Sequence, residues 1–164
     1  DGSTFDIAGL SFRCLLVPGH TLGAISFVVN DAVFTGDTMF VAGCGRLFEG
    51  TPDMMAVSLC DKIGKLPANT RVYCGHEYTE SNLRFAISLE PRNPKLASRF
   101  ERVQGLRSRG TSTVPSTLEE EKQTNPFLRW DSKEIQASVK SVNPSTALDP
   151  VSVFAAVRKM KDSF

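Results

Sequence analysis

The stretch Val33-Phe34-Thr35-Gly36-Asp37 decides how the fold is interpreted, because an apolar, strand-like run stops at a glycine and a carboxylate follows at once. The same order, with histidine in place of aspartate, occurs in Leu15-Leu16-Val17-Pro18-Gly19-His20 and in Val72-Tyr73-Cys74-Gly75-His76. In α/β sheets, ligand-binding side chains gather beyond the carboxyl ends of strands, where glycine lets the chain turn sharply. The sequence therefore predicts that His20, Asp37 and His76 meet at one edge of a sheet.

Around these runs the chain divides into a β-rich part and a helical part. β-branched and apolar runs predict strands at residues 12–17, 25–29, 32–35 and 71–74. Apolar spacing and capping residues predict helices at residues 52–65, 81–90 and 93–110, with others beginning after Thr117, Asp131 and Asp149. We therefore expect an α+β fold with two domains, residues 1–78 and residues 79–164.

Composition limits the partners that the chain can have. The 164 residues are 41% hydrophobic and 23% charged, with a net charge of +1 and no block of basic residues, so neither nucleic acid nor an anionic membrane is an expected partner. No apolar run approaches the roughly 20 residues that span a bilayer. Four widely spaced cysteines predict no disulfide framework, which favours the cytoplasm, or alternatively the mitochondrial matrix.

The three residues after the glycines suit metal chemistry. His20 and His76 are the only histidines in the chain, and imidazole together with carboxylate is a donor set for Zn²⁺ or a similar divalent ion. The two oxygens of Asp37 would allow it to bridge a pair of ions. The alternative is that both histidines are satisfied turn residues and that Asp37 caps its own turn.

Several longer stretches resemble the successive signatures of glyoxalase II (hydroxyacylglutathione hydrolase), a family of the metallo-β-lactamase superfamily. In the β-rich part they are Pro18-Gly19-His20-Thr21, Phe34-Thr35-Gly36-Asp37-Thr38, Gly43-Cys44-Gly45-Arg46-Leu47-Phe48-Glu49-Gly50-Thr51 and Tyr73-Cys74-Gly75-His76-Glu77-Tyr78-Thr79. In the helical part they are Val114-Pro115-Ser116-Thr117-Leu118-Glu119-Glu120-Glu121, Thr124-Asn125-Pro126-Phe127-Leu128-Arg129 and Val157-Arg158-Lys159-Met160-Lys161-Asp162. The likeness covers nearly the whole chain.

The resemblance implies a fold, a metal site and a reaction. The fold would be the second half of an αββα sandwich followed by a helical substrate-binding domain. His20 would bind the first of two divalent ions and His76 the second, with Asp37 as the bridging and catalytic carboxylate; zinc is the expected metal, with iron and manganese as alternatives. The reaction would be hydrolysis of S-D-lactoylglutathione to D-lactate and glutathione, as in methylglyoxal detoxification.

The resemblance also implies a substrate-binding set made of Arg46, Tyr78, Arg158 and Lys161. Arg158 and Lys161 are three apart in the last predicted helix and share a face, where two cations could hold the glycine carboxylate of glutathione. The alternative is that Arg158, Lys159 and Lys161 form a solvated face near a helix C-terminus, favoured by the helix dipole.

One expected signature is missing. The T-H-x-H-x-D-H motif, which supplies ligands to both metals in the family, is absent, and the chain has no third histidine to replace it. We therefore expect a chain that begins within a longer enzyme, that needs the N-terminal half of the catalytic domain as a partner, and that is inactive alone. The alternatives are a non-catalytic module that binds glutathione conjugates or protein, and an enzyme resembling the mono-iron persulfide dioxygenases. Cys44 is expected to be a loop residue rather than a nucleophile, because no basic partner can be placed beside it.

Overall fold

A six-stranded β-sheet organises the first half of the molecule. The computed structural model describes residues 1–164, and the order of strands in the sheet is β1-β2-β3-β4-β7-β8. These strands are β1 (Thr4–Ile7), β2 (Leu10–Leu16), β3 (Ile25–Val29), β4 (Ala32–Gly36), β7 (Arg71–Cys74) and β8 (Ser116–Thr117). A separate hairpin consists of β5 (Met39–Phe40) and β6 (Gly43–Cys44).

The strand directions bring three loops to one edge of the sheet. Strands β2 and β4 are each antiparallel to β3, and β7 is parallel to β4. Strands β2, β4 and β7 therefore run in the same direction, and the loops after them carry His20, Asp37 and His76. The predicted convergence of three strand ends at one edge is confirmed.

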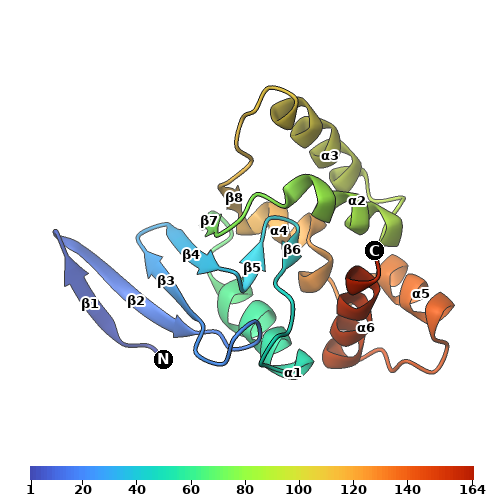
Figure 1. Ribbon diagram of the computed structural model, residues 1–164, viewed down its shortest axis with the longest axis horizontal. Coiled ribbons are helices and arrows are strands. Elements are labelled where there is room, and N and C mark those ends of the chain that lie inside the picture. Colours follow the sequence, from blue (N-terminus) through green and yellow to red (C-terminus); the bar gives the residue numbers. More distant parts are fainter.

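Helical segments lie between β6 and β7 and make up most of the chain after β7. The first helical segment is α1 (Pro52–Ala56), which continues through the π-helical turn η1 (Val57–Lys62) and the 3-10 turn η2 (Ile63–Lys65). The others are α2 (Thr79–Leu89), α3 (Pro94–Arg107), α4 (Leu118–Thr124), the 3-10 turn η3 (Pro126–Leu128), α5 (Lys133–Val142) and α6 (Pro150–Asp162). Figure 1 shows α5 and α6 at the opposite end of the molecule from β1 and β2. None of the helices has the length and apolar character needed to cross a bilayer.

Most of the predicted elements are present, and the α+β class is confirmed. The side chains of Asn93, Thr117 and Asp149 each accept a hydrogen bond from a backbone N–H in the first turn of their helices, as N-cap residues do. The prediction that Asp131 caps a helix is wrong by one residue. The Ser132 N–H donates to the Arg129 carbonyl in a turn, and the helix begins only after Ser132.

One hydrophobic core joins the strands to the helices. It contains Leu15, Val33 and Val72 from the sheet, Met55 from α1 and Val157 from α6, together with fifteen further buried side chains. Strand β8 also pairs with β7, although the two strands belong to different predicted domains. The two predicted parts thus share both the sheet and the core.

The opposite face of the sheet is uncovered. The register pairs Phe5 with Phe12, Phe27 with Phe34, and Phe34 with Tyr73, so these residues lie on one face. The rings of Phe34 and Tyr73 stack at 5.1 Å, yet Phe34 remains 43% exposed and Phe5 37% exposed. We call these five residues the aromatic sheet face. Contiguous exposed apolar surface of this kind marks an interaction site in a soluble protein.

Candidate active site

His20, Asp37 and His76 lie together beyond the ends of β2, β4 and β7. The Nε2 atom of His20 is 3.7 Å from Oδ2 of Asp37, and the Nε2 atom of His76 is 3.4 Å from Oδ1 of Asp37. Each carboxylate oxygen therefore faces a different imidazole. The structure brings together the three residues that the sequence singled out for metal chemistry.

Two glycines allow neighbouring loops to approach Asp37 closely, one at its carboxylate and one at its backbone carbonyl. A Cβ atom at Gly75 would lie 2.6 Å from Oδ1 of Asp37, and one at Gly45 would lie 2.1 Å from the Asp37 carbonyl oxygen. Both distances are shorter than Cβ contacts normally are, so a side chain at position 45 would force the backbone to shift, and one at position 75 would displace the Asp37 carboxylate from its place between the histidines. Gly45 belongs to the motif at residues 43–51 and Gly75 to the motif at residues 73–79.

A backbone carbonyl selects the tautomer of the neutral His20 ring. The Nδ1 atom of His20 is 2.8 Å from the carbonyl oxygen of Arg46. A carbonyl only accepts, so Nδ1 carries the hydrogen and donates it, which leaves Nε2 with a free lone pair in the neutral ring. That lone pair is the one a metal would use, and it belongs to the nitrogen that faces Asp37.

Aromatic contacts and an anchored glutamate hold the loop that carries His76. The His76 ring stacks on Tyr78 at 5.1 Å, and the Phe40 ring meets Tyr78 edge-on at 5.2 Å. Between His76 and Tyr78, the Glu77 carboxylate accepts from the backbone N–H of Thr113 at 2.8 Å. Burial alone would raise the pKa of Glu77, but the hydrogen bonds from Thr113 and Thr79 and the charge of Arg107 together hold the pKa below its usual value. The loop is therefore fixed to the helical part.

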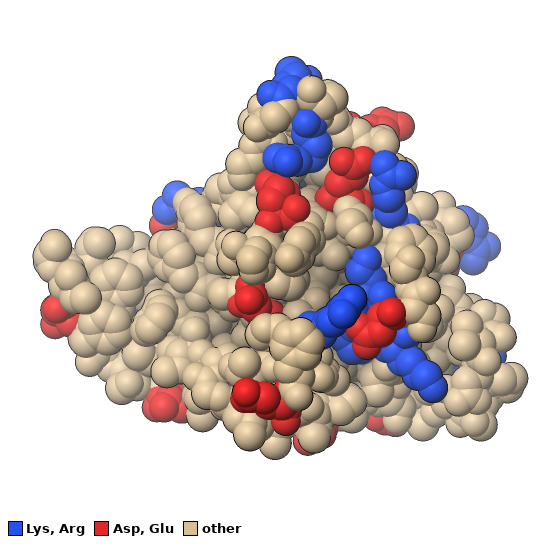
Figure 2. Space-filling model, in the orientation of Figure 1, with Lys and Arg blue, Asp and Glu red and all other residues tan.

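These side chains open into a cavity of about 630 Å³. It is lined by His20, Asp37, Phe40, Cys44, Gly45, Arg46, Phe48, His76, Tyr78, Ser81, Asn82, Arg158, Lys161, Asp162 and Phe164. All seven predicted site residues are among them. Figure 2 shows a compact group of Lys and Arg side chains, with acidic ones among them, over the region of α6.

The two cations of α6 that line the cavity have different environments. The guanidinium of Arg158 is buried, with 5% of the residue exposed, and donates from Nη1 to the Cys44 carbonyl and from Nη2 to Asp162, both at 3.0 Å. The alternative that this helix face is solvated is therefore wrong for Arg158. Of the three guanidinium nitrogens of Arg158, only Nε has no hydrogen-bond partner.

Lys161 has fewer polar partners within the chain than Arg158 has. Its Nζ lies 5.1 Å from the ring centres of Phe85 and Phe164 and 3.4 Å from the Ser81 carbonyl oxygen. Burial, and then the charge of Arg158, lower the pKa of Lys161. Arg46 is exposed at the cavity mouth, with its Nε 3.9 Å from Asp162. Lys161 thus has a desolvated ammonium group that lacks a carboxylate partner.

The structure corrects one statement about Cys44. A basic partner does lie beside it, because Nη1 of Arg158 is 3.6 Å from the Cys44 sulfur. Burial nevertheless raises the pKa of the Cys44 thiol to about 12, and the nearby Arg158 only partly offsets this. The thiol is therefore protonated at neutral pH and is not a nucleophile.

Some lining residues were not found from the sequence. Asp162 follows Arg158 by four residues, so helical spacing was a signal that could have revealed the pair. Phe40 sits in a strand of two residues, which is too short to show any periodicity. Asn82 lies one turn into α2, where nothing in the sequence distinguishes it from a solvent-facing residue.

The donors of this chain form two pairs rather than one closed set. No three His, Cys, Asp or Glu side chains are grouped so as to hold a single ion. His20 and His76 instead lie on different sides of Asp37 and share its carboxylate. The arrangement offers one imidazole and one oxygen to each of two positions.

Comparisons with known proteins agree on one family. The model of the hydroxyacylglutathione hydrolase C-terminus matches residues 77–164. Among curated relatives, the hydroxyacylglutathione hydrolase of Synechococcus sp. (strain JA-2-3B'a(2-13)) is 51% identical over 99% of this chain, and that of Methylobacillus flagellatus is 52% identical over 99%. The chain covers 63% and 64% of these two relatives, just under two thirds of their length.

Solved structures show the same fold. ETHE1 from Myxococcus xanthus is 25% identical, with a TM-score of 0.57, over 99% of this chain and 58% of its own. A metallo-beta-lactamase from Staphylococcus aureus also has a TM-score of 0.57, at 22% identity, over 98% of this chain and 41% of its own. The predicted likeness to the metallo-β-lactamase fold is confirmed.

Proposed function

Because this chain belongs to the hydroxyacylglutathione hydrolase family, we propose that it is the C-terminal part of an enzyme that hydrolyses S-(2-hydroxyacyl)glutathione thioesters. S-D-lactoylglutathione would give D-lactate and glutathione. The observation that carries the proposal is the Asp37 carboxylate, whose two oxygens face two different imidazoles. No observation favours the non-catalytic module or the mono-iron dioxygenase over this reaction.

The residues present fit a pair of divalent ions. His20 would bind one ion and His76 the other through Nε2, with Asp37 shared between them, and the Nδ1 contact of His20 already selects the required tautomer. We propose zinc, since imidazole and carboxylate suit it, and iron and manganese would be distinguished by metal analysis. Ions held by these residues would supply Lewis-acid chemistry: a more acidic bound water and positive charge for the carbonyl oxygen under attack.

Three donors are too few for two ions. A catalytic zinc takes about three protein ligands, so a pair that shares one bridge needs further donors from elsewhere. We propose that they come from an N-terminal half of the catalytic domain, in the part of the relatives' length that this chain does not cover. The aromatic sheet face supports this partner, because its exposed phenylalanines would be buried against a second layer.

The cavity supplies a binding site for the thiol carrier. We assign Lys161 to the glycine carboxylate of glutathione, because its ammonium is partly desolvated and has no acidic partner. Arg158 lies behind it and adds positive charge, while Arg46 and Tyr78 line the path from this end to His76 and Asp37. The thioester carbonyl would then lie at the metal end of the cavity.

The test uses the full-length protein, meaning this chain joined to its N-terminal half. Asp37→Asn keeps the shape of the side chain but weakens one bridging oxygen, so metal content should fall and S-D-lactoylglutathione turnover should drop by at least about 100-fold. Asp61→Asn is the matched control, since Asp61 is exposed and pairs only with Lys65. Wild-type protein that binds no metal and does not hydrolyse the thioester, or an Asp37→Asn variant with full metal and turnover, would refute the proposal.

A further inference from the structure

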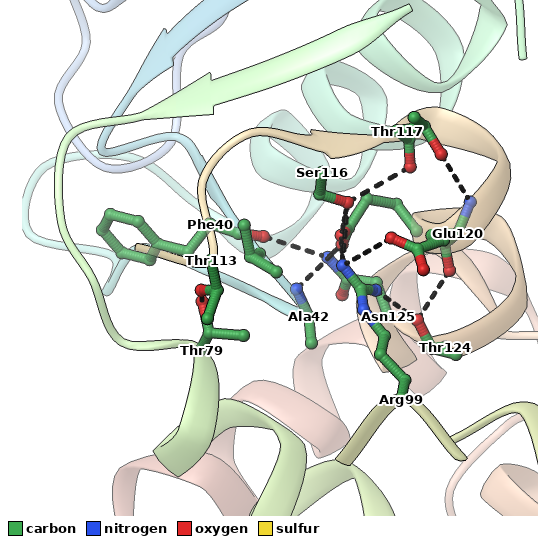
Figure 3. A network of polar contacts seen from close by, with 12 residues as sticks. Phe40, Ala42, Thr79, Arg99, Thr113, Ser116, Thr117, Glu120, Thr124 and Asn125 are labelled. Atoms are coloured by element: carbon green, nitrogen blue, oxygen red, sulfur yellow. Dashed lines mark hydrogen bonds and ion pairs between the residues drawn. The ribbon is translucent and has the colours of Figure 1, made fainter. Parts of the chain in front are cut away.

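The carboxylate of Glu121, on α4, is fully buried and accepts four hydrogen bonds. Figure 3 shows the residues that donate them, Arg99, Ser116, Ala42 and Asn125, gathered around one point. Its Oε1 accepts from Nη2 of Arg99 at 2.6 Å and from the hydroxyl of Ser116 at 2.5 Å. Its Oε2 accepts from the backbone N–H of Ala42 at 2.8 Å and from Nδ2 of Asn125 at 2.9 Å. Arg99 balances the charge, but the Ala42 contact reaches across to the β5–β6 hairpin, which borders the cavity.

The turn of that hairpin has an unfavourable backbone conformation. Ala42 has a φ of 55°, in the left-handed region that glycine tolerates and alanine does not favour, and it is 1% exposed. Such a conformation persists only where the surroundings over-determine it. Here Glu121 accepts from the Ala42 N–H, while Nδ2 of Asn125 donates to the carbonyls of Gly43 at 3.1 Å and Phe40 at 3.4 Å.

The hairpin contacts both ends of the cavity. At the metal end, the Phe40 ring lies 6.0 Å from His76 and 5.2 Å from Tyr78. At the other end, the carbonyl of Cys44 accepts from Arg158 at 3.0 Å. A shift in the turn would therefore move both the Phe40 ring, which lines the cavity, and the Cys44 carbonyl, which binds Arg158.

We propose that Glu121 is a positioning residue for the active site, which acts by holding the Ala42 turn so that Phe40 and the Cys44 carbonyl keep their places. The inference rests on the proposed function for its effect on catalysis. That Glu121 holds the Ala42 turn is inferred from the hydrogen bonds alone. Glu121 itself does not line the cavity.

Two acceptor oxygens at position 121 are essential to this role. Both of its oxygens accept from groups that can donate: Arg99 and Ser116 on one side, Ala42 and Asn125 on the other. In Glu121→Gln the amide NH₂ would face donors on whichever side it lies, so one pair of contacts is lost although the side chain keeps its size. A second change, Ala42→Gly, should relieve the turn because glycine adopts positive φ without steric cost.

In the full-length protein, Glu121→Gln should raise KM for S-D-lactoylglutathione by roughly tenfold, because the turn no longer holds Phe40 and the Cys44 carbonyl in place. Adding Ala42→Gly should lower KM again to within about threefold of wild type without restoring Tm, since Arg99 still lacks its full partner. Glu119→Gln, at an exposed position of the same helix, is the control for charge. Leu118→Ala is the control for stability, and should lower Tm at unchanged KM.

Hydrogen exchange supplies a readout that does not depend on catalysis. Glu121→Gln should speed exchange in residues 39–44 and in residues 74–79, against which Phe40 packs, and Ala42→Gly should slow both again. If Glu121→Gln fails to fold, Asn125→Ala leaves the Arg99 contact in place and should give the same changes. Unchanged exchange in these two segments, or a KM that follows only Tm across all variants, would overturn the proposal. Wild-type protein without turnover would refute the proposed function instead, and exchange would still decide whether Glu121 holds the turn.

Discussion

Replacing Arg158 and Lys161, the two α6 cations that line the cavity, one at a time should separate stability from substrate binding. Arg158→Met keeps an apolar stem over Phe127 but removes the donor to the Cys44 carbonyl, a charge-assisted hydrogen bond worth about 1.5–3 kcal/mol. It also removes the contact with half-exposed Asp162, worth about 0.3–0.5 kcal/mol. The loss of about 2–3.5 kcal/mol should lower Tm by roughly 4–14 °C in a protein of this size.

Lys161→Met should have the opposite profile. The cation–π contacts with Phe85 and Phe164 are lost, but the cost of burying the ammonium is removed as well, so the free energy of unfolding should change by about 1 kcal/mol or less. If Lys161 holds the glycine carboxylate, losing a charge-assisted hydrogen bond should raise KM roughly 10- to 150-fold at nearly constant kcat.

The assay is thermal unfolding together with steady-state hydrolysis of S-D-lactoylglutathione by the full-length protein. Lys159→Met, an exposed neighbour on the same helix, is the control and should change neither quantity. An Arg158→Met variant with wild-type Tm would show that the Cys44 contact is energetically unimportant. A Lys161→Met variant with unchanged KM, or with collapsed kcat, would refute the assignment of this lysine to the thiol carrier.

Two further predictions concern pH. Burial and the charge of Arg158 lower the pKa of Lys161 from its usual 10.5, so the ammonium loses its charge at a lower pH than a free lysine does. The KM for the thioester should therefore increase at a pH below 10.5. In Lys161→Arg, KM measured against pH should show that increase at higher pH, because the guanidinium stays charged. Burial alone would raise the pKa of Glu90, but hydrogen bonds from Arg129 and Ser132 outweigh it and lower the pKa from its usual 4.5. Because the folded-state pKa is lowered, the stabilisation from Glu90 is present above pH 4.5 and is lost as pH falls through the folded-state pKa. The denaturant midpoint should therefore fall more steeply with decreasing pH in wild type than in Glu90→Gln.

The convergence of three loops was predictable because it depends on strand order and direction. Each strand was long enough to show an apolar run, and each run leads to a glycine directly before His20, Asp37 or His76. Connections that place such strands in parallel gather their carboxyl ends at one edge, whatever the detail of packing.

The supporting structure was not predictable, because it is built from short strands and buried charges. Strands β5, β6 and β8 have two residues each, so no period of alternation exists to reveal them. Glu121 ends a run of three glutamates, and charged residues in a helix are usually solvent-exposed. Only the fold shows that Arg99 and the Ala42 turn lie around it.

The most direct test asks whether His20, Asp37 and His76 form part of a two-metal site. Metal content and thioester turnover are measured for this chain alone and for the chain joined to its N-terminal half. We expect the isolated chain to bind little metal and to be nearly inactive, since it offers three donors, and to self-associate through the aromatic sheet face. The joined protein should hold two ions and hydrolyse S-D-lactoylglutathione. Two tightly bound ions and full turnover in the isolated chain would contradict this account.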